Sequence, residues 1–466
     1  MAGTKPSTID ELRASGYRVA SVKEEMRANL IRAIQQKRDF VPGIIGYEDS
    51  VVPQLENAVL SGQDIIFLGE RGQAKSRIIR SLVSLLDDEL PVVSGCEIND
   101  HPYHPICRRC RDLVADQGDG VEIDWLPRDQ RYGEKLATPD STIADLIGEV
   151  DPIRVAEGRY LSDELTIHYG LIPRTNRGIF CINELPDLAE RIQVGLLNIM
   201  EERDVQIRGY RIRLPLDLFL VASANPEDYT NRGRIITPLR DRYGAQIRTH
   251  YPRTVAHEIT IMEQEHTRFE DDDYTVTVPD YMKEIVAEIT RLARRSPDVN
   301  QRSGVSVRAS IADYESLLAN AMRRAIRIGE KDVVPRVSDL PFVIPALSGK
   351  VELETVEDGR DEQIIDKLLQ AATLAVFNRH FNVIDLEDVV ARFKAGLSAE
   401  VSPLLPSKEY VKMVKQIEGL DRAVAKLEPG ENLAVIASGV EFILEGLHLN
   451  KRLNKDKVGG KTQYRG

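Results

Sequence analysis

Apolar residues fall into two kinds of pattern along the chain, and the kind changes near residue 252. Before that point, short apolar runs end in polar or glycine-rich turns: DIIFLGE (64–70), GIFCIN (178–183) and LFLVASAN (218–225). Runs of this length bounded by turns are typical of buried strands. Helical stretches lie between several of them, so we predict an α/β fold with a parallel sheet. Two weaker strand candidates are LPVVSGCEI (90–98) and AQIRTHYP (245–252).

Beyond residue 252 the apolar positions recur at helical spacing instead. PDYMKEIVAEITRLARRS and SIADYESLLANAMRRAIRIGE are examples, and each predicts an amphipathic helix. The first residues also read as helical, with a capping signal in STIDEL. ELETVEDGRDE (352–362) reads as a linker before a last helical region, and the basic end of the chain, 451–466, as a solvated, frayed tail. These patterns predict four segments: 1–43, 44–255, 256–350 and 351–466.

Composition narrows the class of protein. The 466 residues carry 62 Lys and Arg against 74 Asp and Glu, a net charge of −12, which argues against a general nucleic-acid-binding surface. No apolar run reaches the roughly 18 residues that a membrane span needs, and the N-terminus lacks the apolar core of a secretory signal. Four cysteines in so long a chain do not suggest a disulfide scaffold. We therefore expect a cytoplasmic protein without a membrane span.

The stretch GERGQAKS, residues 69–76, lies between a predicted strand and a predicted helix and differs at one position from the phosphate-binding pattern G-x-x-x-x-G-K-[ST]. In such a loop, backbone N–H groups surround the phosphates, the lysine (here Lys75) reaches the β- and γ-phosphates, and the serine (Ser76) holds Mg²⁺. The departure is Ala74 in place of glycine. We expect Ala74 to be tolerated because it already sits at the helix start with a helical φ. The predicted nucleotide-binding residues of this loop are Gly69, Glu70, Arg71, Gly72, Gln73, Ala74, Lys75, Ser76 and Arg77.

Hydrolysis needs further groups, and the two later strands end in them. GIFCINE ends in Asn183 and Glu184, where phosphate-loop ATPases carry an acidic pair. Glu184 is placed to polarise the attacking water, whereas the amide of Asn183 can hold the Mg²⁺ water shell without charge. Asn225 ends the next strand and is placed between the γ-phosphate and the water.

Arginines that could act on a neighbouring subunit's nucleotide lie in RGRIITPLRDRYG, and they are Arg234, Arg240 and Arg242. The alternative for each is an ordinary surface ion pair. A further arginine, Arg308, begins a predicted helix beyond the sheet.

A cluster of sulfur and imidazole groups stands apart from the loop. CEINDHPYHPICRRC places Cys96, Cys107 and Cys110 near His101 and His104. Three thiols and an imidazole suit tetrahedral zinc, so zinc at the three cysteines and one histidine, His104 or His101, is one hypothesis. The alternative is a set of cytosolic thiols in a surface loop. The fourth cysteine, Cys181, lies on an apolar strand and reads as a core residue.

In this order, these pieces resemble the AAA+ ATPases, and most closely the branch that holds the magnesium chelatase ATPase subunit and the MoxR-type ATPases. The resemblance covers roughly residues 44–350. It depends on IIGYEDSV before the first strand, GERGQAKS, the segment from LIGEVDP to RGIF, and the segment from NIMEERD to NPEDY with its inserted hairpin. LRDRYG resembles the stretch with the arginine finger, which falls on Arg242, and VRAS resembles the second-sensor motif, which falls on Arg308.

The resemblance implies a five-stranded parallel αβα ATPase domain over 44–255, a helical lid with the second sensor over 256–350, and a C-terminal helical extension. It further implies ATP and Mg²⁺, a homo-oligomeric ring, with a hexamer as the expected form, and a partner that carries a von Willebrand A-type domain. The leading hypothesis is a motor that hydrolyses ATP to remodel or activate a partner protein. The alternatives are a true magnesium chelatase ATPase subunit and an ATP-dependent scaffold with little turnover.

Overall fold

The computed structural model describes residues 5–151, 153, 156, 164–201, 206–207, 210–211, 214–225, 233–269, 273–301, 303–354, 360–458 and 461–466. They form two compact units, Met1–His250 and Tyr251–Gly466. Part of the predicted linker, residues 355–359, lies outside the described residues. No described helix is long and apolar enough to cross a membrane. The four-segment division at 43, 255 and 350 stays a prediction.

The first unit is built on a five-stranded sheet in the order β11-β1-β10-β7-β4, and every pair in it is parallel. Its strands are β4 (Tyr132–Leu136), β7 (Gly178–Asn183), β10 (Leu218–Ala224), β1 (Ile65–Leu68) and β11 (Ala245–Arg248). Its helices are α1 (Ile9–Ala14), α2 (Val22–Gln35), α3 (Val51–Leu60), α4 (Lys75–Ser81), α5 (Arg108–Gln117), α6 (Ile143–Leu146), α8 (Leu171–Arg174), α9 (Glu190–Glu201) and α11 (Thr237–Arg242).

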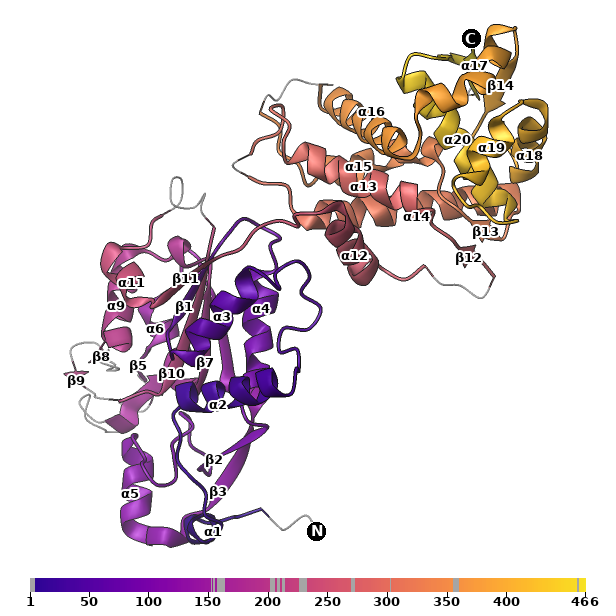
Figure 1. Ribbon diagram of the computed structural model, residues 1–466. Helices are drawn as coiled ribbons and strands as arrows, with labels where there is room; N and C mark the ends of the chain where they lie inside the picture. Colours follow the sequence, from indigo (N-terminus) through magenta and orange to yellow (C-terminus); the bar gives the residue numbers. More distant parts are fainter. Residues whose placement is uncertain are drawn as a thin grey trace. The chain divides into compact units, whose positions relative to one another are not determined.

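Alternate residues of the central strands enter two different cores, one on each face of the sheet. Ile65 and Phe67 of β1 pack with residues of α2, α3 and α4, whereas Ile66 packs with residues of α6, α9 and α11. Figure 1 shows the two helical layers on opposite sides of the strands. Because side chains alternate along a strand, burial on both faces makes each central strand a continuous apolar run, which is why the sequence reveals these strands.

Three strand pairs lie outside this sheet within the first unit, and each is antiparallel. They are β2 (Glu89–Val93) with β3 (Ile123–Pro127), β5 (Gly148–Val150) with β6 (Ile167–Tyr169), and β8 (Gln206–Ile207) with β9 (Tyr210–Arg211). The predicted strand in 90–98 therefore exists as β2 but does not join the parallel sheet. The edge strand β4 takes that place, and its sequence YGEKL has no apolar run to reveal it.

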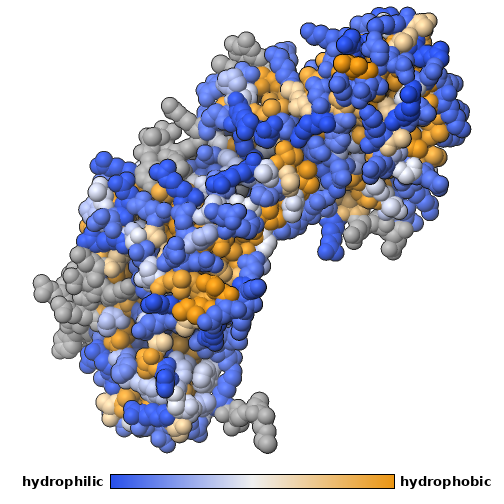
Figure 2. All heavy atoms as spheres, viewed as in Figure 1, coloured by the Kyte–Doolittle hydropathy of each residue, from blue (hydrophilic) through white to orange (hydrophobic). Residues whose placement is uncertain are grey.

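The second unit is mainly helical and shares one hydrophobic core that runs from Met262 to Tyr464. Its helices are α12 (Val255–Glu265), α13 (Asp280–Ala293), α14 (Val307–Ile328), α15 (Ile344–Ser348), α16 (Arg360–His380), α17 (Glu387–Lys394), α18 (Ser407–Gln416), α19 (Leu420–Ala425) and α20 (Leu433–Leu449). A short parallel pair, β12 (Thr275–Val276) and β13 (Asp332–Val333), also belongs to it. In the view of Figure 2, hydrophilic side chains cover most of the visible surface of this unit.

The expectation of a frayed C-terminal tail is wrong. β15 (Asn454–Val458) and β16 (Lys461–Arg465) form an antiparallel pair, and β14 (Ser398–Val401) joins β16 to make a three-stranded sheet. Tyr464 anchors it: the side chain is 3% exposed and its hydroxyl donates to Glu445 on α20. Lysine-rich strands with a single buried aromatic residue read as a solvated tail because most of their side chains do face water.

Candidate functional site

Three polar segments meet at the carboxyl edge of the parallel sheet. The loop after β1 precedes Lys75, Asn225 follows β10, and Asn183 and Glu184 end β7. β10 lies between β1 and β7, and its Ala224 pairs with Leu68 of β1. Because the carboxyl ends of parallel strands share one edge, the loop, the pair Asn183-Glu184 and Asn225 become neighbours.

Several contacts hold the loop in shape. Gly69 N–H donates to the Ala224 carbonyl at 3.1 Å, and a Cβ at Gly69 would overlap the side chains of Thr249 and Gln73. The Gln73 side-chain oxygen accepts from the Glu70 N–H at 3.1 Å and from the Thr249 hydroxyl at 2.7 Å. Glycine at 69 is thus a steric requirement.

Tyr47, from the segment before β1, ties the loop to the end of β11. Its hydroxyl lies 3.0 Å from the Gln73 carbonyl and 2.7 Å from the His250 carbonyl. Burial raises the pKa of Tyr47 to about 12, so the hydroxyl keeps the proton that it donates. Tyr47 was not among the site residues predicted from the sequence, because a tyrosine in the entry segment carries no pattern of its own.

Lys75 is buried and turned back on its own loop. Lys75 as a whole residue is 7% exposed. Its Nζ donates to the Gly69 carbonyl and, at 2.9 Å, to the Glu70 carbonyl. Ser76, Arg71 and Arg77 are exposed on the same loop and first helical turn. The ammonium group is therefore held within the curve of the loop, where an anion would compete with these carbonyl oxygens.

The expectation that Ala74 has a helical φ is wrong. Ala74 has φ 56° and ψ 14°, the left-handed conformation, and Gly72 has φ 73°. The left-handed conformation costs an alanine about 1–2 kcal/mol, because Cβ crowds the following carbonyl oxygen. Gly72 and Ala74, both left-handed, turn the chain sharply before α4. The loop therefore keeps this backbone geometry even though alanine replaces glycine at position 74.

Asn183 is held by two neighbouring strands. Its Nδ2 donates to Glu134 on β4, and its Oδ1 accepts from the Ser223 hydroxyl on β10 at 3.2 Å. The same Ser223 oxygen accepts from the Glu184 N–H at 3.1 Å. Glu184 itself has φ 53°, a left-handed conformation directly after the strand. Ser223 thus fixes both the amide of Asn183 and the backbone turn at Glu184.

Glu134 is a carboxylate that sequence reasoning missed. It accepts from Arg80 of α4 through two bonds of 3.0 Å and from the Tyr132 hydroxyl at 2.9 Å. Burial pulls the pKa of Glu134 upward, but the bonds from Arg80 and Tyr132 and the charge of Arg80 hold it below its usual value. Its neighbour Asn183 is neutral, so the carboxylate beside the strand end is supplied from β4. An isolated glutamate in YGEKL gives no signal in the sequence.

The predicted arginines are spread over the edge and beyond it. Arg234 faces Glu190 at 3.6 Å, and Arg242 donates to the Pro238 carbonyl at 2.8 Å. Arg240, rather than Arg242, lines a cavity of about 420 Å³ together with Gly69, Glu70 and Arg248. Arg308 is exposed at the start of α14 in the second unit. Arg240 is therefore the finger candidate that shares a cavity with the chain's own loop.

The predicted zinc ligands are only partly brought together. Cys96, Cys107 and Cys110 lie within one group of potential ligand atoms, but the fourth member among the described residues is Asp100, not His104. Cys181 lies on β7 and is fully buried in the core. The thiol group belongs to the connection between β2 and β3, away from the carboxyl edge of the sheet.

Comparisons with known proteins bear on the family of the chain. No family model matches the chain. A magnesium-chelatase subunit ChlI of Nostoc sp. is 26% identical over 367 residues, which are 74% of this chain and 90% of the relative. The 38 kDa subunit of magnesium chelatase from Rhodobacter capsulatus is 28% identical over 237 residues, 48% of this chain and 59% of the relative.

Among solved structures, the complex between subunits BchI and BchD of magnesium chelatase gives a match at 22% identity with a TM-score of 0.36, over 70% of this chain and 98% of that one. A putative ATPase from Cytophaga hutchinsonii matches at 16% identity with a TM-score of 0.32, over 77% of this chain and 98% of that one. The two curated relatives named above are magnesium chelatase subunits, and the AAA+ resemblance and the α/β fold with a helical C-terminal part are confirmed.

Proposed function

We propose that the protein is an ATP-hydrolysing AAA+ motor whose cycle acts on a partner protein. One observation carries the proposal: the buried Lys75, the pair Asn183-Glu184 and Asn225 follow three adjacent strands of one parallel sheet, β1, β7 and β10. This arrangement gathers a phosphate-binding cation, a base and a polar sensor at one edge. The homology to magnesium chelatase subunits supports the same reading.

The loop residues fit a triphosphate. Lys75 Nζ now donates to two loop carbonyls, and it would exchange them for β- and γ-phosphate oxygens when ATP binds. Ser76 and Asn183 would hold Mg²⁺, which when bound neutralises charge on the phosphates. The neutral Asn183 is matched by Glu134, whose carboxylate is anchored by Arg80 of the helix that follows the loop. We infer that Glu134 supplies the negative charge that Asn183 lacks.

The remaining residues act on the water and on the leaving phosphate. Glu184 would accept the proton of the attacking water. The bond from its N–H to Ser223 holds the left-handed backbone turn at Glu184, and this turn sets the direction in which the side chain leaves the backbone. Asn225, 1% exposed at the end of β10, would orient the same water. Arg242 would act on the nucleotide of an adjacent subunit, and Arg308 would act as the second sensor. Both roles are carried over from the resemblance, as are the ring and the von Willebrand A-type partner.

The test is steady-state ATPase activity of the purified chain. We expect Mg²⁺-dependent hydrolysis that Glu184→Gln abolishes while ATP still binds, because that change removes the base but keeps the shape of the side chain. Glu122→Gln is the matched control, since Glu122 is an exposed glutamate directly before β3. Binding of ATP with no hydrolysis above the Glu184→Gln level would instead favour the scaffold.

A true chelatase subunit is the second candidate, and the match to the ChlI relative over 90% of its length favours it. In that case the chain should replace the corresponding subunit in a reconstituted magnesium chelatase and support Mg²⁺ insertion into a porphyrin. ATPase activity without insertion would leave the general motor as the function.

A further inference from the structure

The connection between β2 and β3 gathers three thiols and a carboxylate in one place. Cys96 and Asp100 lie on the loop after β2, Cys107 is the N-cap of α5, and Cys110 lies in its first turn. The ligand atoms of all four lie within 4.8 Å of one another. Asp100, Cys107 and Cys110 are buried, and Cys96 is partly buried.

The carboxylate of Asp100 gives the evidence that this group suits a cation. One of its carboxylate oxygens, Oδ2, accepts from the Cys107 N–H at 2.9 Å. The other, Oδ1, is buried and has no hydrogen-bond partner among the described residues, and Asp100 as a whole is 0% exposed. A buried carboxylate oxygen without a partner is costly unless something positive meets it.

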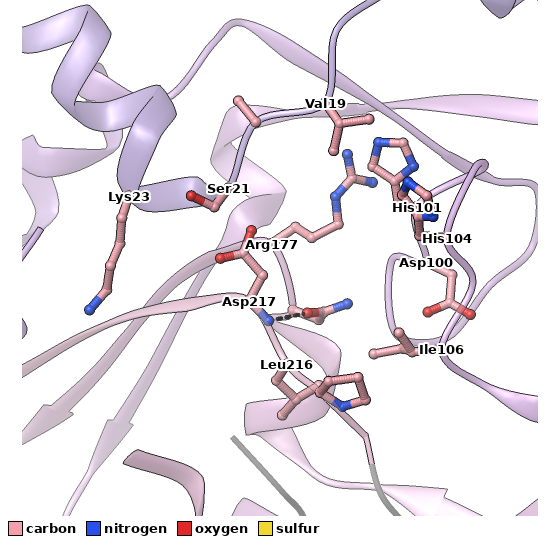
Figure 3. A pocket seen from close by; sticks show the side chains of 13 residues that line it. Val19, Ser21, Lys23, Asp100, His101, His104, Ile106, Arg177, Leu216 and Asp217 are labelled. Atoms are coloured by element: carbon pink, nitrogen blue, oxygen red, sulfur yellow. Dashed lines mark hydrogen bonds between the residues drawn. The ribbon is translucent and has the colours of Figure 1, made fainter. Parts of the chain in front are cut away.

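The two histidines predicted as ligands have other surroundings. His101 Nδ1 accepts from the Tyr103 N–H at 2.9 Å, and His104 is exposed. Both line a cavity of about 490 Å³ that also includes Asp100 and Arg177, but among the described residues neither imidazole belongs to the group of ligand atoms within 4.8 Å of one another. Figure 3 shows the two imidazole rings on the cavity wall, on the same loop as Asp100. Asp100 therefore takes the place that the sequence pattern offered to a histidine.

We propose that Cys96, Asp100, Cys107 and Cys110 bind one zinc ion as a structural site. In a tetrahedral site with Zn–S bonds of about 2.3 Å, neighbouring ligand atoms lie roughly 3.5–3.8 Å apart, which fits within the observed limit. An iron–sulfur cluster would place several iron atoms between its cysteines, so a group this tight suits a single ion. Four protein ligands leave no open position, which is the mark of a structural rather than a catalytic zinc.

Backbone amides support the charge of such a site. The Asp100 N–H donates to Cys96 Sγ and the Cys110 N–H donates to Cys107 Sγ, both at 3.4 Å. Hydrogen bonds of this kind stabilise thiolates and orient them as ligands. The ion would join the loop after β2 to the first turn of α5. Arg109 links the same two segments, because its guanidinium donates to the Gly95 carbonyl at 2.9 Å. The site is separate from the ATP site and does not depend on the proposed ATPase.

Elemental analysis of the tag-free, full-length protein, kept reduced and purified without added metal, tests the proposal. We expect about one zinc per chain, because four deprotonated ligands bind zinc tightly at neutral pH. Cys107→Ala should lose the zinc, whereas Cys181→Ala should keep it, because Cys181 is the one cysteine of the four in the chain that lies outside the group. A zinc content below about a tenth per chain that added Zn²⁺ does not raise would overturn the proposal. Zinc retained by Cys107→Ala, or the visible absorption of an iron–sulfur cluster, would also overturn it.

The fourth ligand is tested with variants that keep the thiols. Asp100→Asn preserves the shape and the bond from Cys107, so it should fold, yet it should weaken zinc binding by at least about tenfold in competition with a chromophoric chelator. His104→Ala should bind zinc as the unaltered protein does. Replacement of the zinc by Co²⁺ gives an independent readout, with intense visible bands for a tetrahedral thiolate site. Loss of zinc in His104→Ala with full affinity in Asp100→Asn would contradict the assignment of Asp100.

Discussion

Asn183 on β7 and Glu134 on β4 form a hydrogen-bonded pair of an amide and a carboxylate, and substitution can exchange the two groups between the strands. Nδ2 of Asn183 donates to the Glu134 carboxylate, so Asn183→Asp alone would remove the donor and place two carboxylates in contact. A lost hydrogen bond to a charged group costs about 1.5–3 kcal/mol, and two like charges about 4 Å apart repel by about 4 kcal/mol at an effective dielectric constant near 20. Because one of the two carboxylates can take up a proton, the repulsion between them costs less than this value. We therefore expect Asn183→Asp to lower the free energy of unfolding by about 2–4 kcal/mol at pH 8.

The pH dependence of this loss has a definite sign. In Asn183→Asp, repulsion raises the folded-state pKa of one carboxyl group of the pair above its unfolded value of about 4. The folded chain then binds more protons than the unfolded chain, so stability falls as pH rises through that window. The unaltered protein behaves in the opposite way at Glu134, whose pKa is held low, because it loses that contribution as pH falls. The difference between the two proteins should therefore be largest at pH 8 and shrink toward pH 5.

The double variant Glu134→Gln/Asn183→Asp is the decisive control. In this variant the amide of residue 134 can donate to the carboxylate of residue 183, which is the reverse of the arrangement in the unaltered protein. The loss in the free energy of unfolding should therefore be at least about 1 kcal/mol smaller than the sum of the losses in the two single variants. Urea unfolding of the four proteins at pH 8 and pH 5 measures the coupling. The double variant also moves the charge to the strand end, so it should need less Mg²⁺ for half-maximal ATPase activity. Stability of Asn183→Asp equal to that of the unaltered protein at pH 8, or additivity within about 0.5 kcal/mol, would refute the reasoning.

Three further predictions concern the loop and the arginines. Lys75→Ala should abolish binding of labelled ATP, since Lys75 is the buried cation of the loop; unchanged affinity would disprove the loop assignment. Ala74→Gly should leave the melting temperature unchanged or raise it, because glycine relieves the left-handed φ, whereas at a helical φ it would cost about 1 kcal/mol. Mixing Arg242→Ala with Lys75→Ala subunits should restore some ATPase activity if Arg242 acts in trans, since a finger contributes about 10³-fold or more in rate. No rescue in rings of confirmed size would point to Arg240.

The parts of the site that could be predicted from the sequence are those that follow one strand directly. Glu184 and Asn225 each stand just after an apolar run, and Lys75 ends the loop that follows one, so their place at the carboxyl edge follows from these runs and from the rule that parallel strands share an edge. The φ of Ala74 did not follow, because the sequence pattern says only that the loop ends there. The left-handed conformation at Ala74 depends on the direction in which the backbone N–H groups of the loop must point. The lysine next to Ala74 in the sequence gives no information on that direction.

The contact between Glu134 and Asn183 escaped prediction because it depends on register between strands. Glu134 meets Asn183 because β4 pairs with β7 so that Leu136 lies opposite Asn183, which brings the side chain of Glu134 beside the strand end. A shift of one residue would turn Glu134 to the other face. The edge strand β4 carries charges because one side of it meets water, so neither its existence nor its register is visible in an apolar pattern.

Asp100 follows the same logic in a loop. Its sequence neighbours His101 and His104 are better zinc ligands by residue type, and the spacing of CEINDHPYHPIC does not separate them. What separates them is the bond from the Cys107 N–H, which turns one oxygen of Asp100 toward the start of α5 and leaves the other among the thiols. A donor set is thus decided by which side chain the backbone directs inward, and a single backbone hydrogen bond can outweigh the preference of residue type. The same holds at the strand end, where Ser223, itself without a motif, directs both Asn183 and Glu184.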